Sequence, residues 1–134
     1  MSGSLDRLLA AIGYPEGEAS PVRGVLSLKV DGQTVKAMED AGRLLLVYSL
    51  GAPEAEVCRR LAGYTAGRLL KEDATLAWDP TAGELILWQG VTASSSADIL
   101  RRFFEVFSAS CDWWRSRLQE EGSGETIPSM MIRP

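Results

Sequence analysis

Two segments of the chain are apolar on both of the faces that a strand presents. Residues Arg43–Leu50 read RLLLVYSL, and Glu84–Gln89 read ELILWQ. Successive side chains of a strand point to opposite faces, so Ile86 and Trp88 share one face and the leucines beside them share the other. A strand with one wet face alternates apolar and polar residues instead. We therefore expect both faces of this sheet to be covered, one by a helix of the chain and the other by a second polypeptide.

Turn signals connect these two segments to three further predicted strands. Asp31-Gly32, Ala41-Gly42 and the stretch from Pro80 to Gly83 are typical of tight connections. The result is an antiparallel meander followed by a hairpin, with strands at Val25–Val30, Thr34–Glu39, Arg43–Leu50, Thr75–Trp78 and Glu84–Gln89. The second of these strands is more polar than the others, and it is predicted to lie at an edge of the sheet or to face solvent.

Three amphipathic helices complete the pattern. The first runs from Ser4, a good N-cap, to Gly13, which suits the position just after a helix end. The second begins at Pro53. The third begins after three serines and is predicted to end at the glycines of Gly122–Gly124. Its main apolar residues step by four and three in turn: Leu100, Phe104, Phe107, Cys111, Trp114 and Leu118.

These elements predict an α+β fold in the order α-β-β-β-α-β-β-α. The fold has a twisted antiparallel sheet of about five strands and three helices. The chain of 134 residues fits one domain, which we place at residues 1–121. Residues 122–134 lack periodicity and are expected to form a flexible C-terminal tail, although Ile127–Ile132 is apolar for a tail.

The composition excludes several classes of partner. With 46% hydrophobic and 24% charged residues, the chain is typical of a soluble globular protein. Its net charge of −4 and its scattered Lys and Arg residues argue against nucleic acid and anionic membranes as partners. The N-terminus lacks the basic region of a signal peptide, and no stretch approaches the ~20 apolar residues of a membrane span. Cys58 and Cys111 show no metal-site spacing and are expected to be reduced thiols.

Residue types that carry enzyme chemistry are sparse. The chain has no histidine, which removes the commonest general base and the commonest metal ligand. It has no nucleophile elbow, phosphate-binding glycine loop or dinucleotide fingerprint. Acidic pairs such as Glu39-Asp40 and Glu120-Glu121 adjoin turn signals and are typical of solvated faces. We therefore expect no enzymatic activity, no cofactor and no metal site.

The positive signal is an excess of apolar area. Leaving side chains such as Val47, Ile86 and Trp88 in water would forgo about 1.5–3 kcal/mol for each. Contiguous exposed apolar area of this kind marks a binding surface. In the alternative, the helices divide between both faces of the sheet and the monomer has a complete core.

Four stretches of the chain together resemble a known family. They are LDRLLAAIGYP near the N-terminus, the meander GVLSLKVDGQTVKAMEDAGRLLLVYSLG, the hairpin TLAWDPTAGELILWQ and the closing helix ADILRRFFEVFSASCDWWRSRL. In order and pattern they resemble the class I type III secretion chaperones, the family of the Tir chaperone. The resemblance extends from about Ser4 to Glu121, and the region of Gly63 and Gly67 departs from it.

The resemblance implies a homodimer in the bacterial cytoplasm, without a cofactor. Such a protein binds the N-terminal region of an effector in extended form, keeps it soluble and competent for export, and meets the secretion ATPase through the effector complex. The first helix and the sheet would offer client-binding residues, namely Leu9, Ile12, Leu26 and Leu28. The middle helix and a nearby strand would offer the dimer interface, namely Val57, Leu61, Tyr64, Ile86 and Trp88. Each of these side chains has an alternative place in the core.

Other functions stay open beside this one. A regulatory protein of the same fold would sequester a secretion regulator, and a subunit of a heterodimeric chaperone would need an unlike partner. A small enzyme would need a deep polar pocket lined by Asp or Glu.

Overall fold

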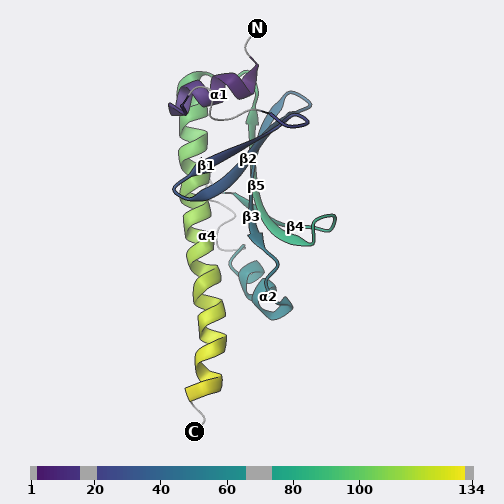
Figure 1. The fold of residues 1–134 in the computed structure, drawn as a ribbon, viewed down its shortest axis with the longest axis vertical. Coiled ribbons are helices and arrows are strands. Elements are labelled where there is room, and N and C mark those ends of the chain that lie inside the picture. Colours follow the sequence, from purple (N-terminus) through teal and green to yellow (C-terminus); the bar gives the residue numbers. More distant parts are fainter. Residues whose placement is uncertain (1–2, 16–20, 66–73, 132–134) are drawn as a thin grey trace.

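The structure is a computed structural model that describes residues 3–15, 21–65 and 74–131, with side chains as far as Glu121 (Figure 1). The elements follow the predicted order α-β-β-β-α-β-β-α. They are α1 (Ser4–Ile12), β1 (Val25–Val30), β2 (Gln33–Asp40), β3 (Arg43–Gly51), α2 (Ala55–Gly63), β4 (Thr75–Asp79), β5 (Glu84–Thr92) and α4 (Ala97–Met131). The predicted α+β fold class is therefore confirmed.

The strands form one antiparallel sheet in the order β1-β2-β3-β5-β4. Two-residue turns join β1 to β2 at Asp31-Gly32 and β2 to β3 at Ala41-Gly42. Both residues of each turn have positive φ, between 52° and 78°. This is the type I′ geometry, whose twist matches that of the flanking strands. Tight turns at both ends place β2 between its neighbours in the sheet, so it is not an edge strand. The other predicted alternative, a strand that faces solvent, agrees with its exposed outward residues Thr34 and Lys36.

The core lies between one face of the sheet and helix α4, which crosses that face along its length (Figure 1). The predicted helical stripe is buried from Leu100 to Trp114, and Leu118 is half-buried. From the sheet, the buried side chains are those that alternate toward the helix: Leu26, Leu28, Val35, Ala37, Leu44, Leu46, Tyr48, Leu50, Leu85 and Leu87. The apolar side chains that recur every three or four residues along the helix thus pack against those that recur every second residue along the strands.

Helix α1 closes one end of this core. Its end is as predicted, because Gly13 takes the left-handed conformation with φ 71°. Its start differs, because Gly3 is the N-cap and Ser4 lies inside the helix. The Ser4 hydroxyl is buried and donates to the Glu39 carboxylate of β2, so it is unavailable for capping. Arg7 donates to the carbonyls of Ala93 and Ser95, which fastens α1 to the connection between β5 and α4.

The predicted end of the last helix at Gly122 is wrong. Helix α4 runs for 35 residues and continues through Gly122–Gly124 to Met131. A glycine costs only about 1 kcal/mol relative to alanine inside a helix, which is too little to end a long one. The flexibility predicted for residues 122–134 stays a prediction, and residues 132–134 lie outside the described part of the chain.

The opposite face of the sheet carries no helix among the described residues (Figure 1). Its apolar side chains, including Val47, Ile86 and Trp88, are only half-buried, while their strand neighbours on the α4 side are buried. For the described residues, the alternative in which the helices divide between both faces is therefore wrong.

The two faces of β5 predict opposite responses to truncation. Leu87→Ala should lower the free energy of unfolding by about 2–5 kcal/mol, because Leu87 is fully buried against α4. The adjacent Ile86→Ala is the matched control and should cost less than half as much in dilute protein. Urea denaturation of both variants measures the difference. Equal losses would show that the outward face is packed as tightly as the core.

Candidate functional site

The uncovered side of the sheet forms a continuous apolar surface, which we call the open face. Cross-strand pairing places Val47 of β3 beside Trp88 of β5, and Leu45 beside Gly90. On the other side of β3, Met38 of β2 pairs with Leu45. The members of the open face are Val25, Met38, Leu45, Val47, Ile86 and Trp88, and all six are half-buried. Side chains from four neighbouring strands thus offer apolar area in one place.

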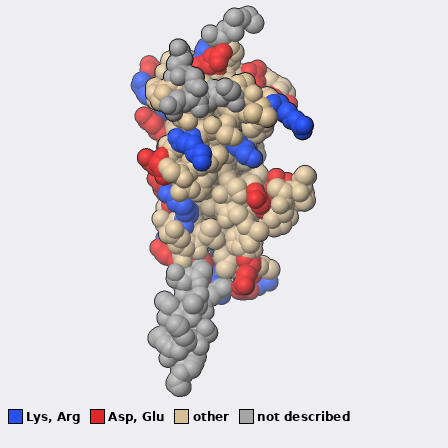
Figure 2. Space-filling view, viewed as in Figure 1, with Lys and Arg blue, Asp and Glu red and all other residues tan. Residues whose placement is uncertain are grey.

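Charges of opposite sign flank a hollow on this face. The hollow has a volume of about 660 Å³, and Val47 and Ile86 line its floor. Arg23 and Lys36 line it from the β1–β2 side, while Asp79 and Glu84 line it from the β4–β5 side. Figure 2 shows the acidic side chains at the projecting hairpin of β4 and β5, and basic side chains over β1 and β2. The surface is therefore apolar in its middle and oppositely charged at its two sides.

A second concave surface, which we call the α1 groove, lies where α1, β1 and α4 meet. It has a volume of about 410 Å³. Ile12 of α1, Val30 of β1 and Phe104 of α4 give it an apolar lining, and Lys29 and Glu105 stand among its charged residues. The groove and the hollow of the open face share no lining residue, so the chain has two separate concave surfaces with apolar linings.

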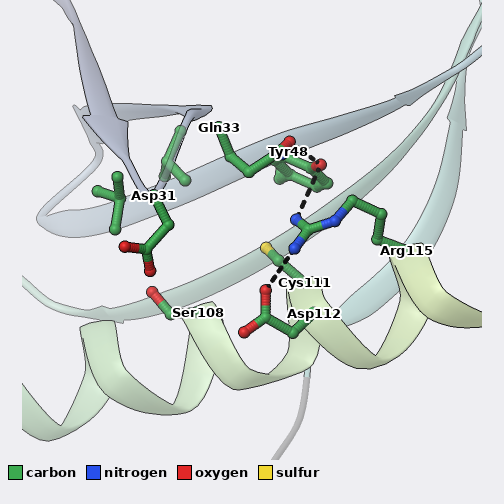
Figure 3. A pocket seen from close by; sticks show the side chains of 9 residues that line it. Asp31, Gln33, Tyr48, Ser108, Cys111, Asp112 and Arg115 are labelled. Atoms are coloured by element: carbon green, nitrogen blue, oxygen red, sulfur yellow. Dashed lines mark hydrogen bonds and ion pairs between the residues drawn. The ribbon is translucent and has the colours of Figure 1, made fainter.

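A small polar cavity lies between the β1–β2 hairpin and α4 (Figure 3). Tyr48 donates a hydrogen bond of 2.5 Å to Gln33, and Arg115 donates to Tyr48 at 3.4 Å and to Asp112 at 2.8 Å. The bond to the Tyr48 oxygen is the main cause that raises the pKa of Arg115, so this guanidinium stays charged. The cavity volume is about 20 Å³, which holds about one water molecule and no substrate.

The four predicted client-binding residues divide into two kinds. Leu26 and Leu28 are 2% and 0% exposed, because α4 covers them, so they lie in the core. Leu9 and Ile12 of α1 are half-buried, and Ile12 lines the α1 groove. The client-binding role of all four stays a prediction, and only the two α1 residues retain area that another polypeptide can contact directly.

The five predicted interface residues divide in the same way. Val57 and Leu61 of α2 are buried in the core. Ile86 and Trp88 belong to the open face. Tyr64 is half-buried at the end of α2, where it forms a network with α4 that is described next. Whether these residues form a dimer interface stays a prediction.

Tyr64 joins α2 to the distal half of α4. Its hydroxyl donates a hydrogen bond of 2.6 Å to the Glu121 carboxylate. Its ring meets Trp113 edge to face at 5.8 Å between centroids, and the Arg117 guanidinium lies 5.1 Å from both ring centroids. These contacts fix α2 at the end of the sheet opposite α1 (Figure 1).

Two features of these surfaces were missed at the level of sequence. Arg43 lies over the Trp88 ring at 5.9 Å and crosses Gly90, where the side chains of Arg43 and Leu45 occupy the space that a Cβ would need. Tyr14 lines the α1 groove and accepts a hydrogen bond from the Lys29 amide. A glycine beside Trp88 in a strand is a signal for the first feature, because strand glycines mark close approach of other groups. The alternation pattern carries no signal for the second, because Tyr14 stands in a loop.

Among the described residues, no group of three or more Cys, Asp or Glu side chains could hold a metal ion. No helix in the described ranges is long and apolar enough to cross a membrane.

Solved structures of type III secretion chaperone complexes share this fold. The HopA1–SchA chaperone–effector complex aligns with a TM-score of 0.66 and 19% identity, over 84% of this chain and 90% of that chain. The heterodimeric ExoU–SpcU complex from the type III secretion system of Pseudomonas aeruginosa aligns with a TM-score of 0.63 and 22% identity, over 87% of this chain and 98% of that chain.

A protein described with a different function also shares this fold. YbjN from E. coli, described as a candidate transcription regulator, aligns with a TM-score of 0.61 and 13% identity, over 91% of both chains. No family model and no curated protein matches the sequence. At these identities the likeness shows the fold, and a function has to be argued from the surfaces.

The contact between α2 and α4 predicts a stability change at alkaline pH. The hydrogen bond to Glu121 is the main cause that raises the pKa of Tyr64 above its usual value of about 10. A raised pKa stabilises the folded state below the unfolded value, and this contribution is lost as the pH rises through the folded value. The melting temperature of the wild type should therefore exceed that of Tyr64→Phe near pH 8, and the gap should narrow by about pH 11.

Glu121→Gln serves as the control for this measurement, because it keeps an acceptor but removes the carboxylate charge. Its stability should depend less on alkaline pH than that of the wild type. A gap between wild type and Tyr64→Phe that is constant across the range would contradict the assignment.

Proposed function

We propose that this chain is a type III secretion chaperone that binds the N-terminal region of an effector in extended form and keeps it soluble and competent for export. The observation that carries the proposal is the one-sided sheet, whose open face and adjoining groove leave apolar area for other polypeptides. The shared fold with chaperone–effector complexes supports it. In this proposal the protein acts by binding alone in the bacterial cytoplasm, without catalysis or a cofactor.

The α1 groove is the proposed contact for the client. An extended segment binds by placing alternate side chains in apolar pockets while its backbone pairs with a strand edge. Ile12 and Phe104 offer such a pocket beside β1, and Leu9 adds apolar area on the same helix. Ordering an extended client costs conformational entropy, so a broad surface is needed to offset it. The secretion ATPase would meet the complex through the bound effector.

The open face is the proposed interface of a homodimer. A two-fold interface brings the same patch of both subunits together, so the patch must complement itself. The basic side, with Arg23 and Lys36, would then face the acidic side of the partner, with Asp79 and Glu84, while the apolar residues meet around the axis. Such an arrangement matches charge and buries Ile86 and Trp88 at the same time.

Ile12→Asp should weaken client binding with little effect on dimerisation. Burying an unpaired carboxylate costs more than the roughly 1–3 kcal/mol of a neutral polar group, so the affinity for the effector should fall tenfold or more. Ala10→Asp is the matched control, since it adds the same charge at an exposed position of the same helix. The measurement is calorimetric titration with an effector that co-purifies from a secreting strain. Equal affinities of the two variants would place the client elsewhere.

Trp88→Asp should convert the dimer into a monomer, because it puts a charge where apolar area is buried. Ala109→Asp, on the exposed side of α4, is the control and should leave the dimer intact. Light scattering should give twice the monomer mass for wild type and control. A monomeric wild type would instead favour a subunit of a heterodimeric chaperone, and a dimeric Trp88→Asp would move the interface away from the open face.

A further inference from the structure

Helix α2 is attached to the rest of the fold over a small area. Of its nine residues, only Val57 and Leu61 are buried, and they lie one turn apart on the same face. Among the described elements, α4 is the one that α2 contacts most. A helix of this length is marginal by itself, so its contacts decide whether it stays in place. Elements that are held by few buried apolar side chains open locally.

The polar attachment of α2 to α4 meets at one carboxylate. Glu121 of α4 accepts the hydrogen bond of 2.6 Å from the Tyr64 hydroxyl, and it lies 3.5 Å from the Arg60 guanidinium. The Glu121 side chain is only 19% exposed, while that of the adjacent Glu120 is 63% exposed. At the other end of α2, the N-cap residue Glu54 makes no side-chain capping hydrogen bond. The described hydrogen bond and ion pair between the two helices thus both depend on Glu121.

The core beside this attachment contains a donor without a partner. Trp114 shares the face of α4 that carries Arg117 and Glu121, because the three residues are spaced by three and four. Its side chain is 1% exposed, and among the described residues its Nε1 has no hydrogen-bond acceptor. A buried donor without an acceptor destabilises the form that buries it. Water that enters when α2 moves away can satisfy this donor, which favours the open form.

We propose that α2 is a movable cover over one end of the core, that Glu121 is its latch, and that α2 opens as a unit while α4 and the sheet stay packed. In the closed form, Val57 and Leu61 are buried and out of reach of any other polypeptide. Opening exposes both, so the latch controls access to them. This inference goes beyond the proposed function and does not depend on it, because no effector takes part in its test.

Iodoacetamide labelling of the full chain tests whether α2 opens by itself. The variant Val57→Cys, made in a Cys58→Ser background, places one thiol beneath α2. The native Cys111 lies between α4 and the β1–β2 hairpin and reports opening of the core. Labelling at position 57 should be at least roughly tenfold faster than at Cys111, with mass spectrometry assigning each site. Amide hydrogen exchange at Leu61, in the chain without an introduced thiol, is a second measure of the same opening.

Glu121→Ala tests the latch. It removes the acceptor of Tyr64 and the ion-pair partner of Arg60, and alanine keeps α4 helical. Labelling at position 57 should become roughly tenfold faster, since a hydrogen bond to a charged group changes an equilibrium by about that factor or more. Glu105→Ala is the matched control, because it makes the same change at an exposed position of α4 beside the α1 groove. It should leave the rate at position 57 unchanged.

Leu87→Ala separates opening of α2 from unfolding of the core. Leu87 is fully buried against α4, so its truncation should speed labelling at Cys111. If α4 and the sheet stay packed when α2 opens, the truncation weakens the closed and the open form equally. The rate at position 57 should therefore change less than about twofold. Equal acceleration at both sites, equal rates at both sites before the truncation, or no response of position 57 to Glu121→Ala would overturn the proposal.

Discussion

One long helix can cover only one face of a sheet, and the rest of the structure depends on this limit. Helix α4 buries the inward side chains of the strands from Leu26 to Leu87. The outward side chains of β3 and β5 are almost as apolar, and α1 and α2 are held elsewhere. Arg7 fixes α1 to the connection before α4, and Tyr64 fixes α2 to the distal half of α4. The open face therefore follows from where the helices are fastened as much as from its own residues.

The order of the elements and the composition of the core could be predicted from the sequence, because both follow from local periodicity. The dipeptides Asp31-Gly32 and Ala41-Gly42 predicted the turns, whose residues take positive φ in the structure. The stripe from Leu100 to Trp114 predicted the long helix. The predictions that were wrong depended on contacts with residues distant in the sequence. Ser4 does not cap α1 because Glu39 of β2 takes its hydroxyl.

Residues of the open face could be predicted only on a strand that carries apolar side chains on both of its faces. Ile86 and Trp88 could be separated from Leu85 and Leu87 by alternation, but alternation does not say which of the two faces a helix covers. For this reason Leu26 and Leu28, named for client contact, lie under α4. Tyr14 could not have been found from the pattern, because its role depends on how a loop lies against the edge of β1.

The four tryptophans occupy four distinct environments. Trp78 is exposed on the edge strand β4, and Trp88 lies on the open face. Trp113 contacts Tyr64, and Trp114 is buried in the core. Indole emission moves to shorter wavelength as water is withdrawn from the ring. Covering the open face therefore changes the spectrum chiefly through Trp88, whereas melting of the core changes it chiefly through Trp114. The chain thus carries built-in optical reporters that distinguish association from unfolding without an attached dye.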